Sequence, residues 1–472
     1  MIRKTKIVCT LGPKSEDEQT LRKMIEAGMN VVRLNMSHGE IDQKRPIVNL
    51  IKRLRSELGV PLAILVDTKG PEVRLGTFSD GSVVIEDGQR FCLTTDANVE
   101  CTKDIATVNY DGLHNDVKRG SKILLNDGLV ELLVENVYDR NIECKVISGG
   151  KLGSRKSLFL PGVKLSLPFL SEADKADLKF ACEIDAEFVA ASFVSSKEDV
   201  YALRNFLRSN GGGGIDIISK IESATGVENI DEIIDASDAI MVARGDLGVE
   251  LSIERLPAIQ KSLIKKAKSK GIIVITATEM LESMTEKLRP TRAETTDVAN
   301  AVYDETSAVM LSGETAVGIN PPHVVKTMAN ICLAAEETCC LKTNFNTMEF
   351  KVKNVADAIS HNACSCAFDL KSSAICVLTL GGTTARMISC FRPLAPILAV
   401  TPNTRTYNKL ALSWGVVPEN TNIFQTTEEM FSEARKLVLK NGLAKEGDNF
   451  IISAGGMLGK SGGTDLIKVE EI

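Results

Sequence analysis

The sequence is poor in aromatic residues and has only a small excess of negative charge. Aromatic side chains make up 4% of its 472 residues, so the cores must be built mainly from aliphatic side chains. A formal net charge of −6 creates no positive field, which argues against nucleic-acid binding and leaves little attraction to anionic membranes. The apolar runs fall short of the roughly 18 residues that cross a bilayer. No signal peptide follows the basic start, and we expect a cytoplasmic protein.

Residues that often form reactive sites are also few or dispersed. There are four histidines, and no serine-histidine-aspartate or cysteine-histidine arrangement suggests a nucleophilic enzyme. Most of the twelve cysteines stand singly in apolar segments and lack the spacing of a zinc site. We interpret them as buried thiols of a reducing compartment rather than as disulfides or metal ligands.

Eight short apolar runs alternate with helical patterns. This alternation predicts parallel strands joined by helices, and eight units predict a closed (β/α)8 TIM barrel in residues 1–69 and 168–340. The capping patterns that support the helices are Ser15 with Glu18, Ser171 with Asp174, and Ser195 with Glu198. The expected strands end at Thr10, Asn35, Asp67, Phe193, Glu222, Asp246, Thr278 and Glu314.

Two segments do not belong to the barrel. Residues 70–167 contain short alternating runs separated by Asp-Gly pairs, which predicts an antiparallel β domain inserted after strand 3. An insertion at that end of a strand sits over the barrel mouth, where it can act as a lid. Residues 341–472 alternate strands and helices and predict a C-terminal doubly wound α/β domain.

Nearly every expected barrel strand ends in polar or charged residues. Because these ends converge on one face of a barrel, they favour a site over independent solvated turns. Lys220 and Glu222 are two apart on a strand, so both project into the mouth, where a plain ion pair is the alternative to a function. With Asp246, Glu222 provides the oxygen ligands that usually hold Mg²⁺. Arg33 and Lys220 remain to hold a phosphoryl group, and Gly245 exposes backbone N–H groups to a carboxylate. A divalent ion, two cations and a lid favour phosphoryl transfer.

Long sequence strings then identify a resemblance to the pyruvate kinase family over essentially the whole chain. The strings are KTKIVCTLGP, AGMNVVRLNMSHG, VDTKGPEVR, ISKIE, DAIMVARGDLGVE, RPTRAETTDVANAV and VMLSGETAVG. The resemblance is to bacterial members without an additional C-terminal domain. It implies transfer of phosphoryl from phosphoenolpyruvate to ADP, giving pyruvate and ATP as the last step of glycolysis.

The resemblance also implies roles for the residues at the barrel mouth. Lys220 stabilises the phosphoryl group in flight and Arg33 contacts it, while Glu222 and Asp246 bind Mg²⁺ or Mn²⁺. The backbone of Gly245 and Asp246, with the Thr278 hydroxyl, holds the substrate carboxylate. Thr278 is also implied to order the water that protonates the enolate. The residues that match the family's K⁺ site are Asn35, Ser37, Asp67 and Thr68.

The resemblance extends to the lid. Glu72 is the residue type that accompanies K⁺ dependence in this family. Arg74 and Lys156 match contacts to the nucleotide phosphates, and Asn35 and His38 are assigned to the same nucleotide site. For His38 a structural loop role is favoured over catalysis.

Three positions depart from the family pattern. Glu279 stands where glutamine is usual, Asn126 replaces the first aspartate of a DDGL string, and Phe159 interrupts an NLPG string. All residues implied to contact substrate or metal remain, so these departures bear on lid geometry and affinity rather than on the reaction.

The C-terminal domain carries a candidate phosphate site. Residues 379–385, TLGGTTA, place glycines and hydroxyls between a strand and a helix N-terminus, although a Gly-rich cap with an N-capping threonine explains them too. The family commonly binds an activating sugar phosphate there, and Gly381 occupies a usual serine position, so the effector, a sugar phosphate or a nucleotide, stays open. A homotetramer with contacts around Arg292 is also implied. The effector-site residues are Thr379, Gly381, Gly382, Thr383, Thr384 and Lys460.

Two other functions fit parts of the sequence. A lyase or mutase acting on phosphoenolpyruvate or pyruvate would need the metal and carboxylate pocket, but neither Arg74 nor Lys156. An inactive homologue that senses phosphorylated metabolites would not need Lys220 and Glu222, and both are present. A metal-dependent kinase is therefore the favoured hypothesis.

Overall fold

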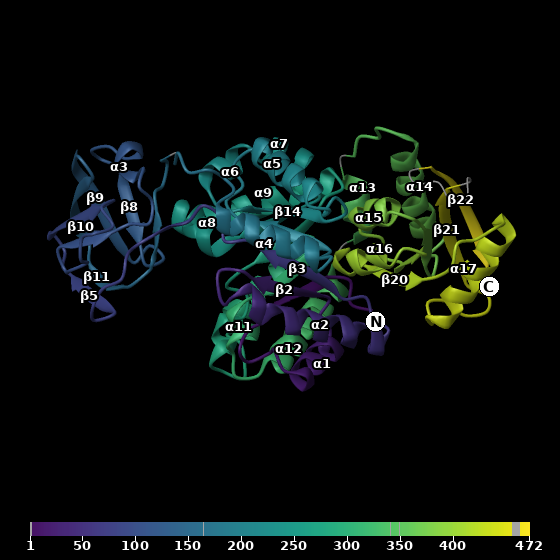
Figure 1. Cartoon of the computed structure of the whole chain (residues 1–472). Helices are drawn as coiled ribbons and strands as arrows, with labels where there is room; N and C mark the ends of the chain where they lie inside the picture. Colours follow the sequence, from purple (N-terminus) through teal and green to yellow (C-terminus); the bar gives the residue numbers. More distant parts are fainter. Residues whose placement is uncertain (1, 164, 340, 349, 456–462) are drawn as a thin grey trace.

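The protein, described from a computed structural model, consists of three units in a row (Figure 1). The structure describes residues 2–163, 165–339, 341–348, 350–455 and 463–472. The barrel lies in the middle, with the small β unit on one side and the C-terminal α/β unit on the other. No helix in the described part of the chain is long and apolar enough to cross a membrane.

The central unit is the closed eight-stranded barrel that the alternation predicted. Every neighbouring pair of strands is parallel, in the order β1-β17-β16-β15-β14-β13-β3-β2. The near-continuous burial of these strands suits a parallel sheet that is covered on both faces. The strands are β1 (Lys6–Thr10), β2 (Val31–Asn35), β3 (Ala63–Asp67), β13 (Phe188–Ala191), β14 (Asp216–Ile221), β15 (Ala239–Ala243), β16 (Ile273–Ala277) and β17 (Ala308–Leu311).

Several of these strands end earlier than the sequence pattern predicted. β15 stops at Ala243 because the next seven residues form helix α8 (Arg244–Glu250), so Asp246 lies on a helix and not on a strand. β13 and β16 stop at alanines, and Phe193 and Thr278 that follow them have left-handed backbone, which ends the sheet. The polar residues after the strands are therefore carried by turns and short helices.

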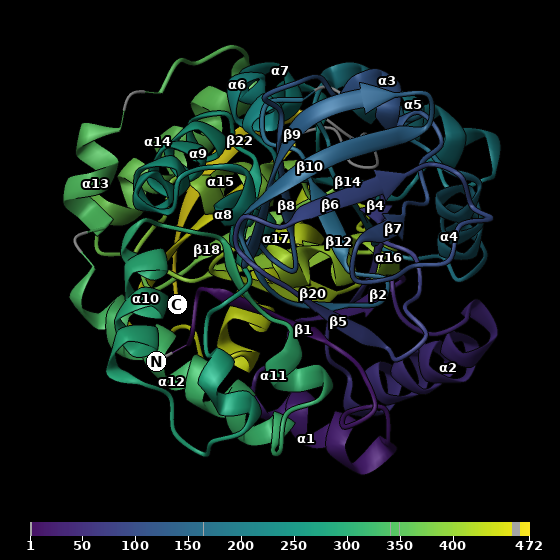
Figure 2. The same cartoon turned by 90° about the vertical axis from the view of Figure 1, so that its left-hand side faces the viewer.

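Helices surround the barrel, as the view along its axis shows (Figure 2). The capping box at Ser171 and Asp174 is confirmed, but the next lies one residue later than predicted, at Ser196 and Asp199. The first helix is capped by Asp17, because Ser15 instead accepts a hydrogen bond from the Gly12 N–H. The helices are α1 (Glu18–Ala27), α2 (Ile41–Leu58), α4 (Glu172–Glu183), α5 (Lys197–Ser209), α6 (Ala224–Glu228), α7 (Ile230–Ala236), η1 (Ile253–Arg255), α9 (Leu256–Ser269), η2 (Glu282–Thr285), α10 (Arg292–Tyr303), α11 (Gly313–Ala316) and α12 (Pro321–Thr338).

The inserted unit is a mostly antiparallel β domain, with one parallel pair, β6 and β7. Gly81, Gly88 and Gly128 of the expected Asp-Gly turns have positive φ, whereas Gly112 precedes the short helix α3 (Leu113–Asp116). The strands are β4 (Val73–Arg74), β5 (Ser82–Ile85), β6 (Arg90–Thr94), β7 (Ile105–Thr107), β8 (Lys122–Leu125), β9 (Val130–Tyr138), β10 (Asn141–Ser148), β11 (Gly150–Gly153) and β12 (Ser157–Phe159).

The C-terminal unit is a five-stranded sheet in the order β20-β19-β18-β21-β22, with β22 antiparallel to the rest. Helices pack on both of its faces, as expected for a doubly wound domain, although the sequence pattern missed β20 and β22. The elements are α13 (Leu341–Thr347), α14 (Val355–Asp369), β18 (Ile375–Leu378), α15 (Thr383–Cys390), β19 (Ile397–Thr401), α16 (Thr404–Lys409), η3 (Leu410–Leu412), β20 (Val416–Asn420), α17 (Thr427–Lys440), β21 (Asn449–Gly455) and β22 (Thr464–Glu471).

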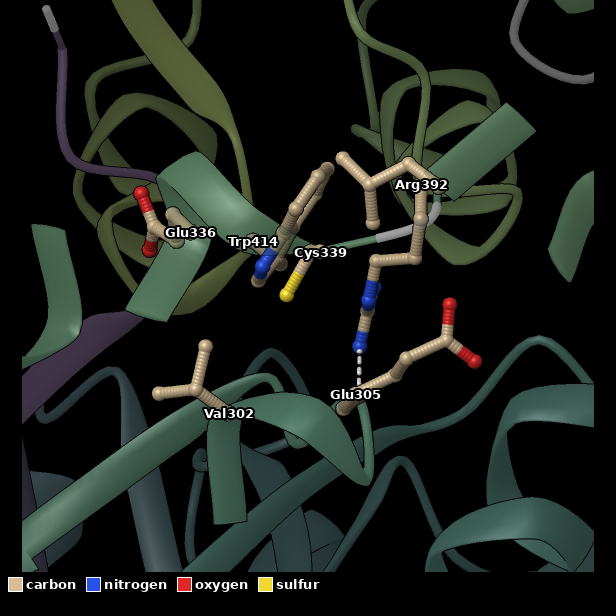
Figure 3. Close-up of a pocket in the computed structure, with 7 residues that line it drawn as sticks. Val302, Glu305, Glu336, Cys339, Arg392 and Trp414 are labelled. Atoms are coloured by element: carbon tan, nitrogen blue, oxygen red, sulfur yellow. Dashed lines mark hydrogen bonds between the residues drawn. The ribbon is translucent and has the colours of Figure 1, made fainter. Parts of the chain in front are cut away.

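The C-terminal unit docks on the amino end of the barrel strands. Leu412 packs into the apolar interior of the barrel, and Lys6 Nζ donates to the Val416 carbonyl at 2.7 Å. A small cavity at this junction is lined by residues of both units (Figure 3). Two of the lining residues are joined by a hydrogen bond: Arg392 donates to the Glu305 carbonyl at 2.7 Å, as the dashed line shows. The C-terminal unit thus does not cover the carboxyl ends of the barrel strands, and the inserted β unit lies on that side.

Candidate active site

The carboxyl ends of β3, β13 and β14 bring three acceptors around the ammonium group of Lys220. Its Nζ lies 2.9 Å from Glu222 Oε1 and 3.2 Å from Asp67 Oδ1, and it donates to Ser192 Oγ at 2.7 Å. Burial alone would lower the pKa of Lys220, but the two carboxylates outweigh it and raise that pKa above its ordinary value. Lys220 is therefore a fixed, buried cation at the barrel mouth.

Arg33 provides a second buried cation beside the first. Its Nε donates to Asp67 Oδ2 at 2.6 Å and its Nη1 donates to Thr10 Oγ1 at 2.8 Å. Burial would raise the pKa of Asp67, but Lys220 and Arg33 hold that pKa below its ordinary value. Asp67 Oδ1 accepts no hydrogen bond in the described structure and meets Lys220 only as an ion pair. This oxygen keeps lone pairs for another cation.

Glu222 and Asp246 form a pair of carboxylates at the same rim. Glu222 Oε2 accepts a hydrogen bond from the Phe193 N–H at 2.7 Å, and Asp246, in α8, lies within hydrogen-bonding reach of Glu222. Burial and then the charge of Glu222 raise the pKa of Asp246 to about 7. Two hard oxygen donors that repel each other fit Mg²⁺, which usually takes one or two carboxylates and completes its shell with water and substrate oxygens.

The Thr278 hydroxyl and the Gly245 backbone meet next to this pair. Gly245 N–H donates to Thr278 Oγ1 at 2.8 Å, and Thr278 Oγ1 donates to the Ala277 carbonyl at 2.6 Å. Thr278 has φ 67 and Glu279 has φ 53, a left-handed backbone that is an outlier for the β-branched Thr278. A substrate carboxylate at this point would share or displace the bond between Gly245 and Thr278.

Arg244 is directed away from the mouth, although it stands two residues before Asp246. Its guanidinium pairs with Asp297 at 2.7 Å and donates to the carbonyls of Thr278 and Glu279 at 2.6 Å and 3.1 Å. Arg244 therefore braces the strained turn after β16. The sequence pattern does not indicate this role, because Asp297 lies on α10 and only the fold brings it close.

The residues expected to bind K⁺ lie at the carboxyl ends of the two neighbouring strands β2 and β3: Asn35 and Asp67 are the last residues of the strands, and Ser37 and Thr68 follow them. Asn35 and Asp67 are register partners, and Asn35 Oδ1 accepts a hydrogen bond from the Ser37 N–H at 3.0 Å. The Thr68 carbonyl accepts a hydrogen bond from Ser192 Oγ at 2.8 Å. The donors are all oxygens and include the unbonded Asp67 Oδ1, so the set fits a hard monovalent cation such as K⁺.

The expected nucleotide residues lie at the base of the inserted unit. Arg74, on β4, is the register partner of Ser157, and the Leu75 N–H donates to the Lys156 carbonyl at 2.9 Å, so the backbone of Lys156 lies beside β4. Arg74 pairs with Glu72 Oε2 at 2.7 Å and remains 40% exposed. Glu72 adds to the raised pKa of Asp246, after burial and Glu222, so the base of this unit faces the barrel mouth. His38 is exposed in the loop that follows β2.

The tip of the inserted unit also approaches the barrel. A Cβ at Gly128 would lie 3.6 Å from Val249 Cγ1 of α8, so this turn touches the mouth. Asn126, one of the departures, has φ 51, a conformation that asparagine tolerates better than most residues. Phe159 is buried within β12, and Glu279 is exposed. All three departures are accommodated without disturbing Lys220 or the carboxylate pair.

The candidate effector loop lies in the C-terminal unit between β18 and α15. Gly382 caps α15 with φ 81, and its N–H donates to Thr379 Oγ1 at 2.9 Å, so a glycine and not a threonine holds the cap position. The Thr384 hydroxyl lies 2.5 Å from that of Thr464. The Gly381 carbonyl accepts a hydrogen bond from Arg386 at 3.2 Å. Thr383 begins the helix, and Lys460 lies outside the described residues.

A closed β/α barrel with two buried cations and a carboxylate pair beneath a β unit is the arrangement of a barrel phosphotransferase. The chain belongs to the pyruvate kinase family, as its resemblance predicted. The family model "Pyruvate kinase, barrel domain" matches residues 2–325, and "Pyruvate kinase, alpha/beta domain" matches residues 357–470.

Curated relatives and a solved structure agree with this membership. The chain is 44% identical to a pyruvate kinase of Clostridium acetobutylicum over 472 residues, covering 100% of each chain. It is 45% identical to that of Bacillus licheniformis over 471 residues, covering 99% of this chain and 80% of the relative. A crystal structure of a pyruvate kinase from Cryptosporidium parvum superposes with a TM-score of 0.94 at 36% identity, covering 99% of this chain and 96% of the other.

Proposed function

We propose that this chain transfers the phosphoryl group of phosphoenolpyruvate to ADP, and that protonation of the resulting enolate gives pyruvate. One observation supports this most directly: the Lys220 ammonium is held between Asp67 and Glu222 at the rim that also carries Asp246. Phosphoryl transfer depends mostly on positioning and charge neutralisation, which fixed cations and a divalent ion supply. The pyruvate kinase relatives indicate the substrate class.

The chain's own residues divide the work as follows. Lys220 and Arg33 neutralise the phosphoryl oxygens as the group moves between acceptors. The backbone of Gly245 and Asp246, with the Thr278 hydroxyl, orients the substrate carboxylate. Thr278 also orders the water that delivers a proton to the enolate carbon. Because each group is held by buried neighbours, little reorganisation is needed at the moment of reaction.

Two kinds of cation complete the proposal. Glu222 and Asp246 would hold Mg²⁺ or Mn²⁺, which would neutralise charge on the phosphoryl oxygens. The all-oxygen set that would hold K⁺ consists of Asn35, Ser37, Asp67 and Thr68. Glu72 at the base of the lid accompanies this K⁺ dependence. Replacing K⁺ by Na⁺ or Tris in an activity assay tests the K⁺ assignment, which fails if the rate is unchanged.

The three units would have separate tasks. Residues 1–69 and 168–340 would form the catalytic barrel. Residues 70–167 would form the lid, where Arg74 and Lys156 contact the nucleotide phosphates, with Asn35 and His38 across the mouth.

Residues 341–472 would bind a phosphorylated effector at the loop from Thr379 to Thr384. Titrating sugar phosphates and AMP at low phosphoenolpyruvate identifies the effector. Family membership also supports a cytoplasmic homotetramer that acts in glycolysis.

A coupled assay tests the main proposal. The purified chain, supplied with phosphoenolpyruvate, ADP, Mg²⁺ and K⁺, is expected to form pyruvate and ATP in equal amounts. Removal of Mg²⁺ with a chelator is expected to stop the reaction, because the ion that Glu222 and Asp246 would hold would no longer neutralise the charge of the phosphoryl oxygens. Pyruvate release without ATP formation would contradict a kinase and favour a lyase or hydrolase.

A further inference from the structure

The hydroxyl of Ser192 connects two parts of the proposed site. Ser192 follows β13 at the carboxyl end of the barrel and is 3% exposed. Its Oγ accepts a hydrogen bond from Lys220 Nζ at 2.7 Å and donates one to the Thr68 carbonyl at 2.8 Å. A serine hydroxyl has a single proton, so its donation to Thr68 turns its lone pairs toward the ammonium. The direction of both bonds is therefore determined.

The three acceptors around Lys220 are chemically different. Glu222 and Asp67 are carboxylates that, under the proposed function, also face Mg²⁺ and K⁺. Their oxygens would then be shared between Lys220 and the cations, which weakens their hold on the ammonium. Ser192 is neutral and is not assigned to any cation. Its contact with Lys220 is therefore the one of the three in which no cation would compete directly for the acceptor oxygen.

We propose that Ser192 is a positioning residue for Lys220, and that through Thr68 it links the orientation of the ammonium to the monovalent-cation site. A cation drawn to the Thr68 carbonyl would act on the hydrogen bond from Ser192, and Ser192 would pass this change to Lys220. This inference rests on the proposed function and deepens it.

The backbone around Ser192 supports such a role. Phe193 has φ 55, an uncommon conformation for an aromatic residue, and its N–H donates to Glu222 Oε2 at 2.7 Å. One turn thus contacts both Lys220 and Glu222. Gly70, in the segment that leads into the lid, has φ 75, and a Cβ there would come within 2.7 Å of Ser192 Cβ. The absence of a side chain at residue 70 lets the lid connection pack against this turn.

A matched pair of substitutions tests the inference. Ser192→Cys keeps the size of the side chain but replaces the hydroxyl with a weak hydrogen-bonding group. Ser219→Cys is the control: Ser219 is the buried serine directly before Lys220 on β14, but its hydroxyl bonds to that of Ser237 at 2.6 Å, on the opposite face of the strand from Lys220. Ser192→Thr keeps the hydroxyl and serves as the conservative variant.

Two measurements are made on each folded variant. The first is kcat and KM for phosphoenolpyruvate with ADP, Mg²⁺ and K⁺. The second needs no substrate: the shift in thermal midpoint when tetramethylammonium chloride is replaced by KCl. We expect Ser192→Cys to lower kcat by about 10- to 100-fold with KM changed less than threefold, and to reduce the K⁺-induced shift. Ser219→Cys and Ser192→Thr should stay near the parent chain in both.

The outcomes separate the inference from simpler explanations. If Ser192 only ties β3 to β13, Ser192→Cys will lower the thermal midpoint but leave kcat and the K⁺-induced shift within twofold of the parent, which overturns the inference. A folded Ser192→Thr variant that loses as much kcat as Ser192→Cys overturns it as well. Absence of phosphoryl transfer in the parent chain would instead contradict the proposed function.

Discussion

The two ends of strand β14 differ in how their buried charges are paired. At its amino end, Asp216 pairs with Lys409 at 2.6 Å and with Arg386 at 3.0 Å, both from the C-terminal unit. At its carboxyl end, Lys220 faces two carboxylates. Burial lowers the pKa of both lysines, but only at Lys220 do the carboxylates outweigh it; the pKa of Lys409 stays below its ordinary value.

The adjacent strand β13 repeats the contrast. Glu187, which precedes it, is surrounded by donors: Arg55 at 3.0 Å, the Ile64 N–H at 2.7 Å and Asn408 at 3.1 Å. At the carboxyl end of the neighbouring strand β3, Asp67 Oδ1 is buried and accepts no hydrogen bond within the described residues, although it pairs with Lys220 at 3.2 Å. Charges at the amino end are matched within the chain and join two units. At the carboxyl end, three carboxylates (Asp67, Glu222 and Asp246) gather around Lys220 and Arg33, so negative charge is in excess, as expected where cations and substrate complete the site.

The largest expected effect comes from removing Lys220, at the carboxyl end of β14. Lys220→Met should lower kcat for phosphoryl transfer at least about 1,000-fold, roughly 4 kcal/mol of barrier, because a cation at the moving phosphoryl group is lost. Exchange of the pyruvate methyl protons, followed by NMR, should be partly retained. Lys409→Met is the matched control and should keep kcat within about threefold. Equal loss of transfer and proton exchange in folded Lys220→Met would contradict this division of roles.

A smaller effect is expected when Asp216, at the amino end of β14, is replaced. Asp216→Asn leaves the Lys409 ammonium and the Arg386 guanidinium without their shared carboxylate, so stability should fall by about 3 kcal/mol, seen as a lower thermal midpoint. kcat at saturating substrate should change little. Asp231→Asn, which breaks an exposed pair with Lys266, is the control and should cost less than about 1 kcal/mol. A clear loss of kcat in folded Asp216→Asn would mean that ion pairing at the amino end also affects the site at the carboxyl end.

The smallest expected effect is a pH dependence at the docking surface. Burial, and then the charge of Arg3, lower the pKa of Lys6 from 10.5 to about 7, with Glu336 opposing them. Between these values the unfolded chain binds more protons at Lys6 than the folded chain, so this contribution to stability rises with pH. From pH 7 to 9 the parent should gain about 2 kcal/mol relative to Lys6→Met. Thermal melts of both proteins at each pH measure this, and a constant gap would show that Lys6 does not titrate.

Much of the fold follows from local patterns, whereas contacts within the site do not. The alternation of apolar runs and caps predicted the barrel, the inserted β unit and the C-terminal domain. The spacing of Lys220 and Glu222 predicted that both enter the mouth, because side chains two apart on a strand share a face. The ends of β13 and β15 were predicted too late, since periodicity does not reveal left-handed turns or a short helix such as α8.

Ser192, Thr10 and Arg244 show what the pattern missed. Ser192 and Thr10 stood at strand ends and so carried a positional signal, but nothing local indicated that they bond to Lys220 and Arg33. Arg244 directly follows β15, and its guanidinium donates to the Thr278 carbonyl, a contact that nothing in the local sequence indicated. Each contact joins residues more than twenty positions apart, and barrel closure sets which strand ends become neighbours.

The sequence by itself determined the order of the barrel strands, the division into three units and the kinds of charge available, because these depend on residues close together in the chain. Only the tertiary structure decided which charges are matched and which are left for ligands. Packing of the C-terminal unit brings two cations to the single carboxylate of Asp216, while at the opposite rim the carboxylates of Asp67 and Glu222 share the single ammonium of Lys220. The balance between burial and neighbouring charge is therefore a property of the assembled barrel.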